Sequence, residues 1–183
     1  MAKLYAQLDD KLIKFIESQH MFFIGTAPLS GDGLVNLSPK GMDTLRILDE
    51  KTIAYLDLTG SGSETIAHLK QNGRFVLMFC SFTNKPMILR LHGKGVVLES
   101  DHSDYPALLK KFPERRGTRA IIKLSAERIA DSCGWGVPEY EFVQERDTYT
   151  KYAANLSDED FRKGQIANAR SLDDLPSLAT PSY

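Results

Sequence analysis

The apolar and polar positions change period along the chain, from a helical spacing at the start to a strand spacing afterwards. The first apolar residues recur on one face of a helix, which predicts a helix over residues 4–20. This stripe consists of Leu8, Leu12, Ile13, Phe15 and Ile16. Later apolar residues come in short runs bounded by glycine, proline or polar clusters, a pattern typical of β-strands. These runs cover residues 21–27, 34–38, 52–58, 74–82, 86–98 and 119–129. Gly93 and Gly95 interrupt the run over 86–98, which therefore predicts one or two strands.

Only short helices interrupt the predicted strands. Residues 65–71 predict one helix after the third strand, and residues 105–112 predict another. A doubly wound parallel fold needs a helix after nearly every strand, which this pattern lacks. We therefore expect a single domain over residues 1–183 with a mainly β (α+β) fold, a small antiparallel barrel with peripheral helices. The chain ends in a polar tail, and residues 179–183 are expected to be loose.

Composition and charge exclude several classes of partner. The formal net charge is −1, so bulk electrostatics does not predict nucleic-acid binding. No apolar run approaches the ~20 residues that span a membrane. The two cysteines and four histidines show no metal-ligand spacing, so no metal site is expected. With no targeting segment visible, the simplest expectation is a cytoplasmic protein with two free thiols.

The segment after the third predicted strand has the composition of a phosphate-binding turn. Its glycines let backbone N–H groups turn toward one point, and the helix start that follows adds unpaired N–H groups and a partial positive charge. Ser61, Gly62, Ser63 and Thr65 are therefore candidate phosphate contacts. The alternative is an ordinary capped helix start, because Ser61 and Glu64 fit the S-x-x-E capping box. The Glu64 carboxylate would also compete with an anion for the same donors.

A second candidate segment lies where the returning strand of the first hairpin ends. Asn36, Ser38 and Lys40 carry an amide, a hydroxyl and an ammonium group into a proline-containing turn. Lys40 would neutralise a phosphate, and Ser38 would donate a hydrogen bond to it. The alternative is a solvated turn, which is the commoner environment of a lysine.

The only tryptophan defines a third candidate segment, residues 132–138. Gly134 permits close backbone approach to a flat ligand, and the indole of Trp135 offers a stacking face. The alternative is a turn in which Trp135 plugs the end of the core. Because no histidine lies near Cys133 in the sequence to activate its thiol, we expect Cys133 to be buried and inert.

The order of these motifs resembles that of one known family. The chain contains Phe-Ile-Gly-Thr-Ala, Val-Asn-Leu-Ser-Pro-Lys-Gly, Gly-Ser-Gly-Ser-Glu-Thr, Arg-Leu-His-Gly-Lys-Gly and Ser-Cys-Gly-Trp-Gly-Val-Pro. Together they resemble the pyridoxamine 5′-phosphate oxidase-like proteins, which are FMN-binding split β-barrels, over roughly residues 8–138. The resemblance implies a homodimeric split β-barrel with two FMN molecules at the subunit interface. It implies a core over about 8–138 and a helical or irregular extension over 139–183.

The resemblance also implies which residues hold the FMN. They lie on the second and third strands and at the start of the following helix: Ser38, Lys40, Tyr55, Leu56, Asp57, Ser61, Ser63 and Thr65. The segment with Cys133, Gly134 and Trp135 would add a later contact, with the partner subunit as one source. One departure matters, because the oxidase proper has Ser-Arg-Lys where this chain has Ser63, Glu64 and Thr65. Losing hydrogen bonds to charged groups costs about 1.5–3 kcal/mol each, so Lys40 and the backbone donors would have to compensate in binding FMN. The oxidase's substrate-binding arginine pattern near the C-terminus is also not found in this sequence, which argues against oxidation of pyridoxine phosphate.

The leading functional hypothesis is therefore an FMN-dependent oxidoreductase acting on a small molecule that the sequence does not identify. The flavin would carry the chemistry, and no side chain is assigned a catalytic role. Two alternatives stay open. The same fold would hold haem, with His68 or His92 as the axial ligand, or a deazaflavin. Otherwise the protein is a non-catalytic flavin-binding or stress-response module.

Overall fold

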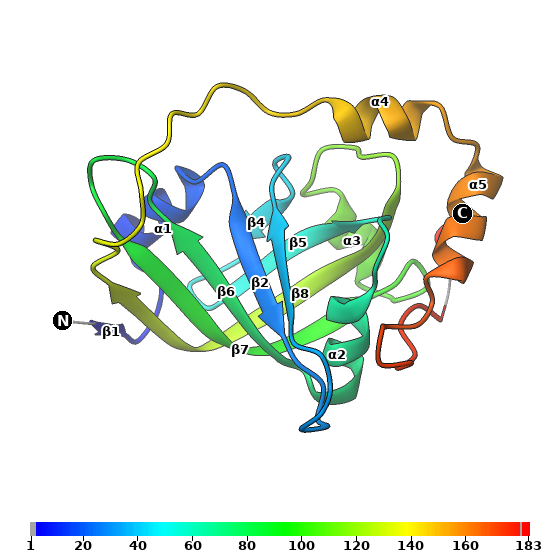
Figure 1. Cartoon of the computed structure of the whole chain (residues 1–183), viewed down its shortest axis with the longest axis horizontal. Helices are drawn as coiled ribbons and strands as arrows, with labels where there is room; N and C mark the ends of the chain where they lie inside the picture. Colours follow the sequence, from blue (N-terminus) through cyan, green and yellow to red (C-terminus); the bar gives the residue numbers. More distant parts are fainter. Residues whose placement is uncertain (1–2, 180) are drawn as a thin grey trace.

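The computed structural model describes residues 3–179 and 181–183, and its strands form one antiparallel sheet (Figure 1). The strand order is β3-β2-β6-β7-β8-β5-β4, with β1 paired to β8. The strands are β1 Leu4–Tyr5, β2 Phe22–Thr26, β3 Asn36–Lys40, β4 Leu45–Ile47, β5 Thr52–Leu58, β6 Arg74–Cys80, β7 Ile88–Leu98 and β8 Thr118–Ser132. The sheet curls into a partly closed barrel, which confirms the predicted mainly β, split-barrel fold.

Helices lie at the periphery of the sheet. They are α1 Asp10–Glu17, α2 Glu64–Asn72, α3 Tyr105–Leu109, α4 Thr148–Ala154 and α5 Asp158–Ala167. Asp9 begins α1 by accepting a hydrogen bond from the backbone N–H of Leu12 at 2.9 Å. The predicted helix after the third strand is α2, which ends at Gly73 in the left-handed conformation.

Two apolar clusters explain why β5 has a nearly continuous apolar sequence. One face of the sheet packs against α1 in the main core, which includes Leu12, Ile24, Tyr55 and Leu77. The opposite face of β5 and β8 packs against α3 in a second cluster. This cluster contains Ala54, Leu56, Leu98, Tyr105, Phe112 and Ile121. Burial on both faces leaves few positions for solvated side chains, so a charged residue inside β5 needs a partner.

The structure corrects two expectations about the ends of the chain. The first helix begins at Asp10, not at residue 4, because Leu4 and Tyr5 pair with β8 and the Tyr5 hydroxyl donates to Asp131 at 2.6 Å. The expectation of a loose end over 179–183 is wrong for the residues described there, which exclude residue 180. Ser182 hydrogen-bonds Gln165, and the Tyr183 hydroxyl accepts from the Gly117 N–H at 2.6 Å.

The chain after β8 wraps around the sheet. Residues 133–147 cross the open side of the barrel as an extended segment and lead to α4 and α5 (Figure 1). Residues 168–178 then turn back and pack against α2 and the β2–β3 hairpin. The C-terminal part therefore covers the region where the candidate residues of β3, β5 and α2 lie.

Candidate functional site

The side chains of β3 and α2 form one hydrogen-bonded corner. The amide of Asn36 donates to the hydroxyls of Thr26, at 3.2 Å, and Thr65, at 3.0 Å. Its oxygen accepts from the Ser38 hydroxyl at 2.9 Å. The hydrogen of Ser38 is thus already used. The Thr65 hydroxyl accepts from Asn36 and also interacts with the Tyr55 phenol, so it connects the corner to β5.

A charged network lies beside this corner. The Asp57 carboxylate pairs with the Lys40 ammonium at 3.3 Å and with the Arg119 guanidinium at 2.5 Å. Arg119 also donates to the carbonyl of Gly62, at the start of α2, at 2.6 Å. Asp57 and Arg119 are buried, whereas Lys40 is partly exposed. Two cations face one carboxylate, so the network has one net positive charge available to an anion.

The protonation states in this network follow from its geometry. Burial alone would raise the pKa of Asp57, but the charges of Arg119 and Lys40 outweigh it and hold the pKa below the ordinary value. Burial raises the pKa of Tyr55 well above the ordinary tyrosine value, and the nearby Asp57 charge adds to this. Burial also raises the pKa of Tyr149 to about 12. At neutral pH both phenols therefore keep their O–H donors.

Three buried polar atoms around this network have no hydrogen-bond partner among the residues that the structure describes. They are the hydroxyl of Tyr55, the hydroxyl of Tyr149 and the Nη1 of Arg119. Buried polar groups are nearly always paired, so unpaired ones call for bound water or a ligand. All three can donate, which fits a group rich in acceptors such as a phosphate.

The start of α2 is not capped by a side chain of its own segment. The hydroxyl of Ser63 instead donates to the backbone carbonyl of Asn168 at 2.7 Å, so the predicted alternative of a capping box is wrong. The Glu64 carboxylate folds back over Gly62, where any larger side chain would collide with it. Ser61 is exposed. Backbone N–H groups at the start of a helix favour an anion when no side chain caps them.

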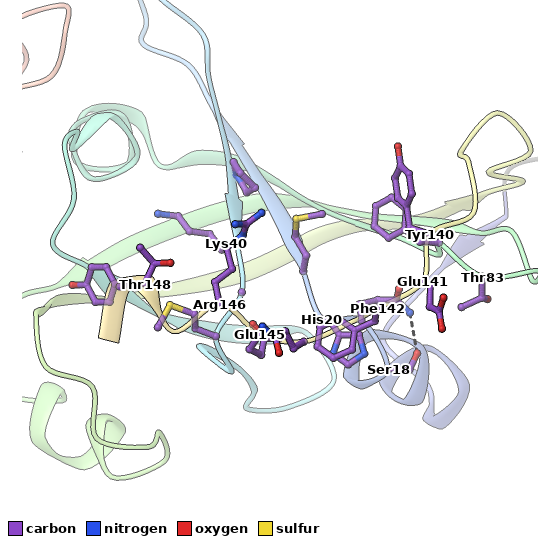
Figure 2. A pocket seen from close by; sticks show the side chains of 18 of the residues that line it. Ser18, His20, Lys40, Thr83, Tyr140, Glu141, Phe142, Glu145, Arg146 and Thr148 are labelled. Carbon is purple, nitrogen blue, oxygen red and sulfur yellow. Dashed lines mark hydrogen bonds between the residues drawn. The ribbon is translucent and has the colours of Figure 1, made fainter. Parts of the chain in front are cut away.

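An apolar cavity of about 880 Å³ adjoins the corner at Lys40. The cavity lies between the end of β3, the residues after β6 and residues 140–152. Side chains from these three parts of the chain face the cavity in Figure 2. Its aromatic lining consists of Phe82, Tyr140, Phe142, Tyr149 and Tyr152. The rings of His20 and Phe142 stack with centroids 3.6 Å apart and planes 5° from parallel. The charged residues Lys40, Glu141, Glu145 and Arg146 also border the cavity. Its size and aromatic lining suit an organic ligand with a planar ring.

The third predicted segment lies apart from the corner within this chain. Cys133, Gly134 and Trp135 follow the end of β8, whereas Arg119 lies at its beginning. The side chain of Trp135 is 82% exposed, so the alternative of a core plug is wrong. The expectation of a buried Cys133 is also wrong, because the buried thiol is Cys80. Leu56 packs into the second apolar cluster, so only its backbone can reach a ligand.

His68 lies between the corner and residues 168–178 of the C-terminal part. The Thr26 hydroxyl lies 3.0 Å from Nδ1 of His68, and either atom can be the donor, depending on the tautomer of the ring. Nε2 of the same ring faces Asp173 at 3.9 Å. Burial lowers the pKa of His68 and favours the neutral ring. The ring is wholly buried, so His68 is not placed as an open axial ligand. His92 is an exposed residue of β7.

Arg119, Tyr149 and Asp173 are the residues that sequence reasoning missed. Arg119 had one usable signal, because it is a charged residue followed directly by a buried run in β8. The partners Asp57 and Arg119 are 62 positions apart, and only the β5–β8 register brings them together. Tyr149 and Asp173 had no local signal, since each lies in a polar segment.

The described residues show neither a metal-binding cluster nor a membrane-spanning helix. No three His, Cys, Asp or Glu side chains among them converge to hold a metal ion. Over the same residues, none of the helices combines the length and apolar character that crossing a membrane requires.

Comparisons with known proteins place these features in context. The family model described as pyridoxamine 5′-phosphate oxidase matches residues 8–133. The pyridoxamine 5′-phosphate oxidase family protein ustO of Aspergillus flavus is 35% identical over 197 residues, which cover 97% of this chain and 78% of that protein.

Solved structures with a similar fold have low sequence identity. A candidate pyridoxamine 5′-phosphate oxidase from Lactobacillus delbrueckii gives a TM-score of 0.55 at 18% identity, over 69% of this chain and 98% of that one. The FAD binding protein from Mycobacterium smegmatis gives a TM-score of 0.51 at 11% identity, over 69% of this chain and 97% of that one. At these identities the likeness shows the fold alone.

Proposed function

Because the chain belongs to the pyridoxamine 5′-phosphate oxidase family, we propose that it binds FMN and acts as an oxidoreductase on a small molecule. The observation that carries the proposal is the group of unpaired buried donors of Tyr55, Tyr149 and Arg119, beside the uncapped start of α2. The similar fold of an FAD binding protein supports a flavin as the ligand class.

Different residues of the chain would bind the phosphate and the ring of the flavin. Thr65, Lys40 and the N–H groups at the start of α2 would hold the phosphate, and the cavity beside Lys40 would enclose the flavin ring. The aromatic lining would exclude water from the ring, and bound flavin would supply hydride or electron transfer. Asp57 positions the ammonium of Lys40 without reaching the ligand itself.

Arg119 would compensate for the basic residues that the family pattern has at the helix start and that this chain lacks at Ser63-Glu64-Thr65. Its guanidinium reaches the start of α2 from β8, because Nη2 donates to the Gly62 carbonyl. A buried, permanently charged guanidinium supplies positive charge that the helix start lacks in its own sequence. This arrangement supports phosphate binding despite the presence of Glu64.

The proposal includes a homodimer in the cytoplasm. Leu37 on the edge strand β3, and Leu34 and Val35 just before it, expose apolar side chains. An unpaired apolar edge favours a partner chain. A second copy is also the route by which Trp135 could reach a flavin, since the chain's own site lies at the other end of β8. Two unpaired cysteines are the support for a reducing compartment.

The direct test is the visible absorbance of the purified protein, followed by titration with FMN and riboflavin. Lys40→Met should weaken FMN binding roughly 10- to 100-fold, and Thr65→Val roughly 10-fold, because each removes a contact to a charged phosphate. Riboflavin has no phosphate, so its affinity should change little. Lys14→Met removes an exposed lysine of α1 and serves as the matched control.

Two outcomes would contradict the proposal at different levels. A colourless protein without measurable affinity for FMN or riboflavin would rule out flavin binding. Bound FMN that neither NADH nor NADPH reduces, in the presence or absence of candidate substrates, would support the non-catalytic module instead.

A further inference from the structure

Residues 168–178, here called the clasp, lie across the phosphate corner and outside the part that the family model matches. The Ser63 hydroxyl donates to the carbonyls of Asn168, at 2.7 Å, and Arg170, at 3.3 Å. On the next turns of α2, the Lys70 ammonium donates to the Ser177 carbonyl. The clasp is thus attached to α2 at two points along the helix. The first point is Ser63, the residue at which α2 begins.

Asp173 attaches the clasp to the β2–β3 hairpin. Both oxygens of its carboxylate accept from the Leu34 backbone N–H, at 3.2 and 3.0 Å. The side chain is only 22% exposed, and the ring that it faces, His68, is neutral. The nearby Arg170 pairs with Asp174 instead. A partly buried negative charge therefore lies just before the beginning of β3.

The order of features along β3 indicates where the Asp173 charge lies relative to a bound ligand. The cavity adjoins Lys40 at the end of the strand, the corner residues Ser38 and Asn36 follow toward its beginning, and Asp173 lies beyond them. At the usual rise of a strand, the Cα atoms of Asn36 and Lys40 are about 13 Å apart. A ligand with its ring in the cavity and its phosphate at Thr65 and the start of α2 would meet the clasp immediately beyond that phosphate, because Ser63 at this start donates to the clasp carbonyls.

We propose that the clasp is a specificity element that restricts the site to a flavin ending in a single phosphate, with Asp173 repelling a second one. The inference rests on the proposed flavin function and goes beyond it by selecting the mononucleotide over the dinucleotide. The backbone of the clasp, held against α2, would occupy the space into which the adenylate of FAD extends. The Asp173 carboxylate adds like-charge repulsion, which is a common means of rejecting a competing ligand.

The test compares the affinities of the full chain for FMN and FAD, with riboflavin as the ligand that lacks phosphate. The wild-type chain should prefer FMN over FAD roughly 100-fold, because desolvated like charges cost several kcal/mol. Asp173→Asn keeps the size of the side chain and removes its charge, so it should reduce this preference at least about tenfold. Ser63→Ala releases the clasp from the start of α2 and should also increase FAD affinity.

Asp174→Asn is the matched control, because it makes the same change one position along on an exposed side chain. It should leave the preference unchanged, and circular dichroism with thermal melting verifies that each variant is folded. Equal affinity of the wild-type chain for FMN and FAD, or an unchanged preference in both clasp variants, would overturn the proposal. Failure of all three flavins to bind would instead reject the flavin function itself, and this inference with it.

Discussion

The buried ion pair between Asp57 and Arg119 is the residue-scale feature on which the site most depends. Removing one partner of a buried pair leaves the other charge uncompensated, which costs about 3–5 kcal/mol. Arg119→Met should therefore lower the free energy of unfolding in urea by about that amount. Lys163→Met, which removes an exposed pair with Glu159 on α5, should cost less than about 1 kcal/mol. Equal small losses in both variants would show that water already reaches Asp57.

His68 makes stability depend on pH. Because burial lowers its pKa in the folded chain, the unfolded chain binds the proton more readily below about pH 6.5. The free energy of unfolding should thus fall as pH decreases from 7 to 5. His68→Gln should show a flatter dependence in urea titrations across this range. Parallel curves for the two proteins would mean that the ring is not protonated more easily on unfolding. Asp57, whose pKa is also lowered, loses its contribution at lower pH, below its ordinary pKa.

Single residues of the site could be predicted where a short segment carried the signal. Asn36, Lys40 and Thr65 belong to local motifs, and the structure brings them to one corner. Arg119 and Asp173 could not be predicted in the same way, because their roles depend on register and on the path of the chain. The donor state of Ser38 is a further example, since only its bond to Asn36 shows that its hydrogen is used.

At the scale of elements, the apolar runs predicted the strands better than the glycines within them. Gly93 and Gly95 suggested an interruption, but β7 is continuous from Ile88 to Leu98 and absorbs Gly93 as an irregularity in its pairing with β8. The reason is steric, because a side chain at Gly93 would collide with the Ser125 carbonyl. The position of the first helix was misjudged because Leu4 and Tyr5 follow the same apolar pattern but pair with β8.

This irregularity leads to an element-scale prediction. Gly93→Ala should destabilise the fold by about 2 kcal/mol and lower the melting temperature by roughly 4–8 °C, because the neighbouring backbone cannot move aside freely. Gly31→Ala is the control, since nothing lies within 4 Å of its added carbon. Differential scanning calorimetry measures both. Similar melting temperatures would show that β7 and β8 can separate locally at little cost.

At the scale of the whole molecule, one exposed feature is not explained by the folded chain alone. The edge strand β3 and the residues before it present Leu34, Val35 and Leu37 to solvent, with Val35 78% exposed. An apolar edge beside a ligand site is costly in water and prone to pairing with another chain. If this edge is the dimer interface, the purified protein should have about twice the 20.5 kDa mass of one chain by light scattering.

Leu37→Asp decides between an interface and an ordinary exposed edge. A charge placed in the centre of an apolar interface should convert the dimer to a monomer, because the carboxylate would be desolvated without a partner. Ile166→Asp introduces the same charge on an exposed position of α5 and should leave the mass unchanged. If the monomer also loses FMN while its melting temperature without flavin is preserved, the partner subunit contributes to the site. A Leu37→Asp protein that stays dimeric would place the interface elsewhere, with the Trp135 segment as the next surface to test.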